Sequence, residues 1–200
     1  MTATSWDMAV VRYPLGPKLI TAALLAACLG RAGGAEASTM LALDLAELTA
    51  RADDVVLATV IGARAEPARG LIVTRVLVRV EVTVAGRSGP ADELEVIVPG
   101  GELDGLGLLV QGAPRLEPGR RYLLFLERTN PSFRVVGMAQ GAMPVEEDRR
   151  GRLLVEPPEG LPGLVRPVGG RLVPALPAVS AATLLDEVTA RVREVRADGR

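Results

Sequence analysis

The sequence predicts a mainly β protein, a small Greek-key barrel with a short helix before it and a longer helix after it. A 13-residue run, residues 72–84, alternates β-branched and mostly polar side chains with the period of two that a long strand requires. Shorter runs of strand-forming residues lie on either side, separated by turns rich in glycine and proline. Apolar side chains recur at helical spacing in residues 41–53 and 180–200, which predicts the two flanking helices.

Composition limits both the core and the partners. The 200 residues are 48% hydrophobic but only 2% aromatic, so a single core must be built from valine, leucine, isoleucine and alanine. The formal net charge of −1 lacks the excess of positive charge that is typical of proteins that bind nucleic acid. Nucleic-acid stacking also needs aromatic side chains, and these are scarce. We therefore expect no nucleic-acid partner.

The first 37 residues have the pattern of a secretory signal peptide. Arg12 and Lys18 precede the apolar run Leu19–Leu29, and a stretch of small residues follows. The apolar run is shorter than the roughly 20 residues that a spanning helix needs. The pattern predicts an exported protein, periplasmic or extracellular.

Two processing sites are compatible with this leader. Cleavage after Ala35-Glu36-Ala37 would make Ser38 the first mature residue. Alternatively, Leu25-Ala26-Ala27-Cys28 resembles the lipobox of bacterial lipoproteins, in which the cysteine is lipidated. A lipid on Cys28 would anchor the protein to the envelope, and this is the only membrane contact that we expect.

The residues after the leader begin with a well-marked helix start. Asp44 can cap the helix while Glu47, three residues later, reaches back to the cap. Leu43 and Leu48 stand at the two positions of a hydrophobic staple. We expect a helix of about two turns within residues 41–53, dependent on packing for its stability.

The following strands suit a barrel of the OB type. At about 3.3 Å per residue the run 72–84 would span roughly 40 Å, a length that bending across a small closed barrel would use. We assign this OB-like barrel domain to residues 38–155. Its other expected strands are Val55–Ile61, Leu94–Val98, Arg120–Glu127, Phe133–Met138, Met143–Val145 and Leu153–Val155. We expect turns at Gly62–Gly70, at Leu116–Gly119 and around Gly151.

The last part of the chain divides into two segments. Residues 156–179 hold six prolines and four glycines, which predicts an extended crossing without regular structure. Residues 180–200 predict the C-terminal helix, with Ser180 as a possible cap. Its apolar positions are Leu184, Leu185, Val188, Val192 and Val195.

Residues 53–145 resemble the netrin-type OB modules of the tissue-inhibitor-of-metalloproteinases family. The segments that carry the resemblance are residues 52–60, the long strand, residues 116–125 and residues 133–137. They look equally like a group of uncharacterised small exported bacterial proteins. The resemblance implies an OB barrel and export. The family's inhibitory mechanism does not carry over, because it uses an N-terminal cysteine to chelate zinc and Ser38 has no thiol.

Many kinds of catalysis are closed to the exported part of the chain. The whole chain has no histidine. Its single lysine, Lys18, and its single cysteine, Cys28, both lie within the first 37 residues. Histidine-based acid–base catalysis, serine and cysteine triads and lysine Schiff bases are therefore excluded. Zinc and copper sites would lack imidazole and thiolate ligands. A carboxylate pair or a calcium site with oxygen ligands would still be possible, but no EF-hand spacing occurs, and we expect no cofactor and no metal.

The candidate site residues lie in two places. The loop 99–112 contains Gly100, Gly101, Glu102 and Asp104, which combine flexible backbone with two carboxylates. Arg75 and Arg79 share one face of the long strand with Glu81, and arginine is favoured at protein interfaces.

These residues predict a non-catalytic binding domain that engages another secreted or envelope protein. Two alternatives stay open. One is a carboxylate-dependent hydrolase that uses Glu102 and Asp104. The other is a structural envelope lipoprotein anchored at Cys28.

Overall fold

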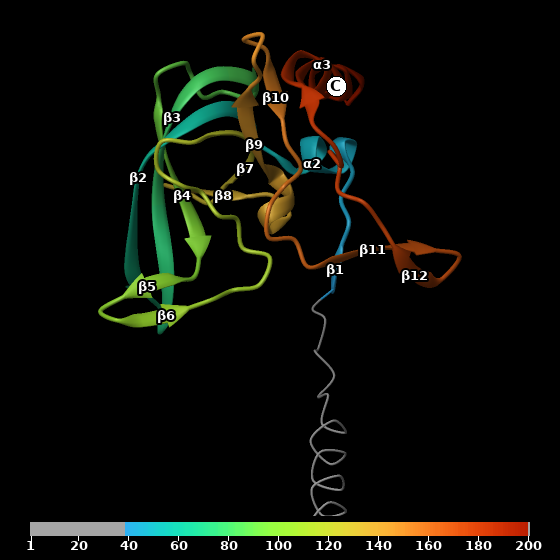
Figure 1. Ribbon diagram of the computed structural model, residues 1–200. Helices are drawn as coiled ribbons and strands as arrows, with labels where there is room; N and C mark the ends of the chain where they lie inside the picture. Colours follow the sequence, from blue (N-terminus) through green and yellow to red (C-terminus); the bar gives the residue numbers. More distant parts are fainter. Residues whose placement is uncertain (1–38, 200) are drawn as a thin grey trace, which may run out of the picture. The chain divides into compact units, whose positions relative to one another are not determined.

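The computed structural model describes residues 39–199 (Figure 1). The predictions for Cys28 and for the cleavage site at Ala35–Ala37 lie outside the described residues. The helices are α2 (Leu45–Arg51), α3 (Leu185–Asp198) and the 3-10 helix η1 (Met138–Gly141). No helix within residues 39–199 has the length and apolar character needed to cross a membrane.

A five-stranded barrel forms the centre of the structure. The strands in chain order are β1 (Thr39–Leu41), β2 (Asp54–Ala68), β3 (Leu71–Ala85), β4 (Glu93–Pro99), β5 (Gly101–Leu103), β6 (Leu106–Leu108), β7 (Arg121–Arg128), β8 (Phe133–Val135), β9 (Ala142–Glu147), β10 (Leu153–Val155), β11 (Gly163–Val168), β12 (Arg171–Pro174) and β13 (Thr183–Leu184). The main sheet has the order β13-β10-β9-β7-β2-β3-β4-β8, and β7 also pairs with β8. The strands β2, β3, β4, β8 and β7 therefore close on themselves, with β4 and β8 parallel. This arrangement confirms the mainly β, OB-like barrel with two flanking helices.

The expected turn at Gly62–Gly70 is wrong, because β2 runs on to Ala68. The turn is confined to Arg69 and Gly70, which both have positive φ, as a two-residue hairpin turn requires. Pro67 is tolerated in the strand because β7 covers β2 only from Asp54 to Thr59, so the outer edge at Pro67 has no neighbour.

The barrel has an inner core and an outer core. Val76, Val78 and Val80 of β3 point into the barrel, as the alternation predicts. Val82 of the same run is exposed and Val84 is buried in the outer core, so the part of the pattern that faces the inner core ends at Val80. Strand β7 is buried on both faces: Tyr122 points inward while Phe125 packs in the outer core. The two aromatic side chains thus lie on opposite faces of the strand.

Helices α2 and α3 cover the outer core. Asp44 and Glu47 form the predicted capping box of α2, and Leu43 and Leu48 are both buried in the outer core. The C-terminal helix begins later than predicted, at Leu185, and Ser180 does not cap it. The reason is that Thr183 and Leu184 pair with β10 as strand β13 before the helix starts.

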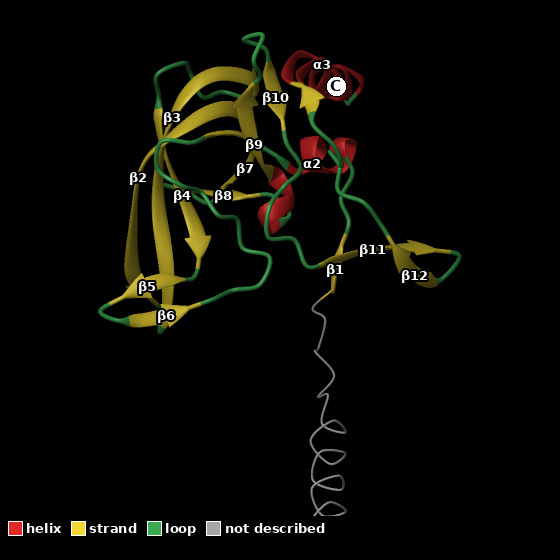
Figure 2. Ribbon diagram, in the orientation of Figure 1, coloured by secondary structure: helices red, strands yellow, loops and turns green. Residues whose placement is uncertain are grey.

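Two other expectations are corrected by backbone geometry. Strand β8 ends at Val135, short of the predicted Met138, because Gly137 and Met138 have positive φ and turn the chain into η1. Residues 156–179 are not free of regular structure, since β11 and β12 form a hairpin that joins β1 in a separate three-stranded sheet (Figure 2). Pro167 fits into β11 because β1 pairs only with Gly163–Val165.

Candidate functional site

The predicted loop 99–112 is a short hairpin followed by an irregular return. Strands β5 and β6 lie across the ends of β2 and β3 (Figure 1). Gly100 and Gly101 line a cleft at this end of the barrel, whereas Glu102 and Asp104 are exposed and do not line it. The structure therefore separates the two glycines from the two carboxylates that the sequence placed in one candidate site.

This loop cleft, formed by residues 98–101 and 108–116 against β3, has a volume of about 610 Å³. Its apolar floor includes Val76, Val98 and Leu116, which also belong to the inner core. Leu109 stands at the cleft and is 84% exposed. Among the described residues that line the loop cleft, Arg115 is the one with a charge. The side chains of the loop cleft are thus mostly apolar, with two neutral polar groups, Thr74 and Gln111, and a single positive group.

Backbone hydrogen bonds hold the wall of the loop cleft. The Gly100 N–H donates to the Ile72 carbonyl at 2.9 Å, and the Thr74 hydroxyl donates to the Gly100 carbonyl at 2.8 Å. Gly100 has a φ of +89°, and a Cβ there would lie 2.6 Å from the Leu108 carbonyl oxygen. Only glycine fits this position. The wall is therefore preformed backbone, as is common in binding sites.

The predicted arginine stripe on β3 is engaged in ion pairs. Arg75 donates from Nε to Glu66 on β2 and from Nη1 to Glu95 on β4. Hydrogen bonds with Glu66 and then Glu95 raise the pKa of the Arg75 guanidinium. Arg79 bonds Glu93 at 2.8 Å. Because these charges already face carboxylates across the sheet, the stripe has no free guanidinium at Arg75 or Arg79 to receive an anion.

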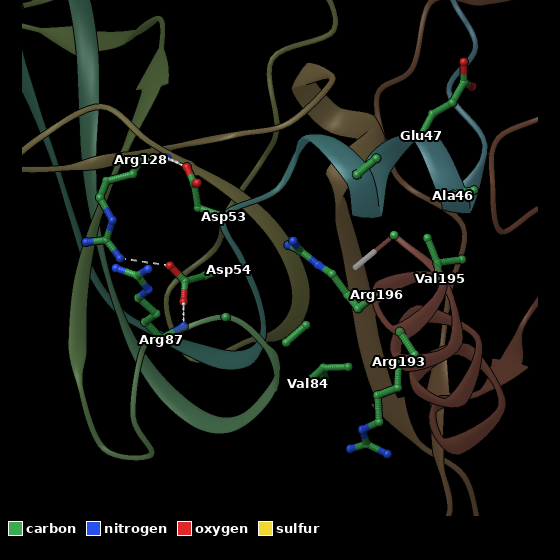
Figure 3. A pocket seen from close by; sticks show the side chains of 15 residues that line it. Ala46, Glu47, Asp53, Asp54, Val84, Arg87, Arg128, Arg193, Val195 and Arg196 are labelled. Atoms are coloured by element: carbon green, nitrogen blue, oxygen red, sulfur yellow. Dashed lines mark hydrogen bonds and ion pairs between the residues drawn. The ribbon is translucent and has the colours of Figure 1, made fainter.

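A larger cleft, of about 1130 Å³, lies where the barrel meets α2 and α3 (Figure 3). We call it the arginine cleft because its lining includes four arginines: Arg87, Arg128, Arg193 and Arg196. The acidic side chains in its lining are Glu47, Asp53 and Asp54. Sequence reasoning missed this cleft, since its charged residues come from distant segments and show no shared spacing.

Asp54 is the central group of the arginine cleft and is completely buried by its neighbours. One carboxylate oxygen accepts the N–H groups of Arg87 at 2.7 Å and Ser88 at 2.8 Å, and the other accepts Nη2 of Arg128 at 3.0 Å (Figure 3). Burial by itself raises the pKa of Asp54, but the hydrogen bonds from Ser88 and Arg87 outweigh it, so the pKa lies below 3.8. Asp54 is therefore an ionised structural anchor with no free oxygen for general-base catalysis.

Neither cleft shows a metal-binding arrangement. In the part of the chain from residue 39 to residue 199, no three histidine, cysteine or acidic side chains come together in a way that could hold a metal ion. Comparison with protein-family models, curated proteins and solved structures found no match. The likeness to netrin-type modules stays a prediction, and the two clefts and the exposed surfaces are the features of the molecule that bear on function.

Proposed function

We propose that this protein is an exported, non-catalytic binding domain, and that its loop cleft takes an extended apolar segment of another secreted or envelope protein. One observation carries the proposal: a preformed backbone wall lines an apolar cleft with the highly exposed Leu109 at its rim. An apolar partner residue that entered this cleft would gain about 25 cal/mol for each Å² removed from water.

Exposed leucines on neighbouring hairpins support this assignment. Leu71 begins β3, Leu106 begins β6, and both are exposed, as is Leu109. Gly101 of β5 approaches Thr74 and Ile72 of β3, so the two hairpins are in contact. Large apolar side chains gathered at one end of a domain are typical of a protein-binding surface.

The positions of the carboxylates favour binding over hydrolysis. Glu102 and Asp104 project from an exposed hairpin outside both clefts, while Asp54 is fully hydrogen-bonded. A hydrolase that uses a carboxylate pair would need both groups to converge on one substrate bond. The leader pattern supports export, and lipidation at Cys28 would make the protein an envelope lipoprotein with the same binding surface.

Selection of peptides on the purified full-length protein tests the loop cleft. We expect a random displayed library to yield apolar peptides whose binding shifts the amide resonances of Gly100 and Arg115. Leu109→Glu should weaken the selected peptide at least tenfold. Leu172→Glu, a change at another exposed leucine on β12, should leave its affinity unchanged. Equal affinity for the wild type and Leu109→Glu would refute the proposed site.

A separate assay addresses the hydrolase alternative. The wild-type protein and Glu102→Ala are incubated with peptide, ester and glycoside substrates, and product formation is measured. We expect no turnover above buffer with either protein. Turnover by the wild type that disappears in Glu102→Ala, with an unchanged circular dichroism spectrum, would replace the binding proposal with an enzymatic one.

A further inference from the structure

The separate sheet β1-β11-β12 has an outward face made mostly of apolar side chains, with the paired residues Thr39 and Gly163 at one end. The register places Leu41 beside Val165 and Val165 beside Pro174. Pro167 is paired with Leu172, two residues further along the same strands. Residues that pair across strands share a face, as do residues two apart. We call the set of Leu41, Val165, Pro167, Leu172 and Pro174 the outer sheet face.

The opposite face of this sheet is turned toward the rest of the domain beside β1, whereas at the hairpin tip its Val168 and Val173 are 58% and 37% exposed. Leu164 is buried, and Arg166 forms ion pairs with Asp44 at 3.4 Å and Glu47 at 3.6 Å at the start of α2. The outer sheet face therefore points away from the domain, and Leu41 and Leu172 are 58% and 64% exposed. A solvated face of a sheet normally carries polar residues, so this apolar one indicates a surface that something else covers.

We propose that a lipid bilayer covers the outer sheet face. The short connection between β1 and the predicted lipidation site favours a bilayer as the partner. Strand β1 begins at Thr39, eleven residues after Cys28. Even a fully extended connection of that length reaches at most about 40 Å. A lipid on Cys28 would thus keep β1, the first strand after it, close to the membrane. The inference rests on the lipid-anchored form of the proposed function.

The surroundings of the outer sheet face suit a membrane interface. Leu176, shortly after β12, is 74% exposed and extends the apolar surface along the chain. Arg171 pairs with Val168 at the tip of the β11–β12 hairpin, and both are exposed on the opposite face. The hairpin tip therefore exposes large apolar side chains on both faces with one arginine beside them, a composition that suits contact with a membrane interface.

Tryptophan fluorescence can locate the contact, because the sole tryptophan of the chain, Trp6, belongs to the leader. Leu172→Trp and Leu109→Trp each place a probe at an exposed leucine, the second one at the loop cleft. The proteins are isolated with their natural processing, and intact mass records whether Cys28 is lipidated. They are then mixed with vesicles of phosphatidylcholine and phosphatidylglycerol that contain brominated acyl chains.

We expect brominated lipid to quench Leu172→Trp at least twofold more strongly than Leu109→Trp. Adding Leu41→Glu to Leu172→Trp should lower the quenching of that probe at least twofold while the lipid anchor keeps the protein on the vesicles, and adding Leu109→Glu should not change it. Equal quenching of the two probes would overturn the inference. So would a blue shift at Leu172→Trp without quenching, accompanied by a dimer mass, which would assign the face to a second copy.

This result is independent of the loop cleft. Peptide affinity reports on Leu109, whereas lipid quenching reports on Leu172, so either proposal can fail while the other holds. A processed protein that begins at Ser38 without lipid and shows no quenching would also overturn membrane docking.

Discussion

The carboxylate of Asp54 lies 3.0 Å from Nη2 of Arg128, and this ion pair joins the first residue of β2 to the last residue of β7. The same guanidinium is 4.5 Å from the centre of the Phe133 ring on β8, within the range of a cation–π contact. The second carboxylate oxygen holds the turn between β3 and β4 through Arg87 and Ser88. One buried charge thus connects four parts of the barrel.

Asp54→Asn should lower the free energy of unfolding by about 3 kcal/mol at neutral pH, because the amide leaves the partners of the carboxylate imperfectly paired. The pKa of Asp54 is lowered in the folded state, so its stabilisation is present above 3.8 and is lost as the pH falls through the folded pKa. The difference between variant and wild type should therefore shrink in acid. Urea denaturation at pH 7 and at pH 3 measures it, with the exposed Asp104→Asn as control. A difference that is the same at both pH values would contradict this role.

Gly86→Ala should destabilise the protein by about 2 kcal/mol. Gly86 has a φ of +120°, and a Cβ would lie 2.3 Å from the Asp54 carboxylate and 2.8 Å from the Asp53 carbonyl oxygen. The turn that supplies the N–H groups to Asp54 would have to move. Gly62→Ala is the matched control, since no heavy atom lies within 4 Å of its Cβ position. Equal urea concentrations at the unfolding midpoints of the two variants would contradict the prediction, because they would mean that the turn can move without loss of stability.

Gln140→Leu should cost about 1 to 3 kcal/mol, because it leaves buried backbone groups without partners. The buried amide of Gln140 accepts the Leu43 N–H at 2.8 Å and donates to the Leu41 carbonyl at 3.0 Å. Hydrogen exchange of the Leu43 amide should become faster in the variant. The exposed Gln111→Leu provides the control. Unchanged exchange at Leu43 would mean that water replaces the side chain without loss.

Arg75→Gln should change the free energy of unfolding only slightly, because its ion pairs with Glu66 and Glu95 are partly exposed. The difference should diminish in high salt, which screens such pairs. Denaturation at low and high ionic strength measures both effects. A cost of several kcal/mol that is insensitive to salt would indicate a core role for Arg75.

Local patterns in the sequence were sufficient to predict many of the strands and helices of the fold. The alternation of residues 72–84 predicts β3, and Asp44 with Glu47 predicts the start of α2, because both signals act between neighbours in the chain. The length of β2 could not be read in this way. In the sequence, Pro67 indicates a turn. It fits a strand only because β2 has no paired strand on that edge beyond Thr59, and this depends on where the pairing with β7 ends.

The sequence alone determined a β-rich domain with an aliphatic core, and it showed that residues 38–200 contain no histidine, cysteine or lysine. Tertiary structure decided how the candidate residues are used. It placed Gly100 and Gly101 in a cleft, left Glu102 and Asp104 on the surface, and paired Arg75 with Glu66 and Glu95. It also created the arginine cleft and the outer sheet face. Periodicity reports which face of one element is buried. A site depends on the register between elements, and that register is set when the strands pair in the folded domain.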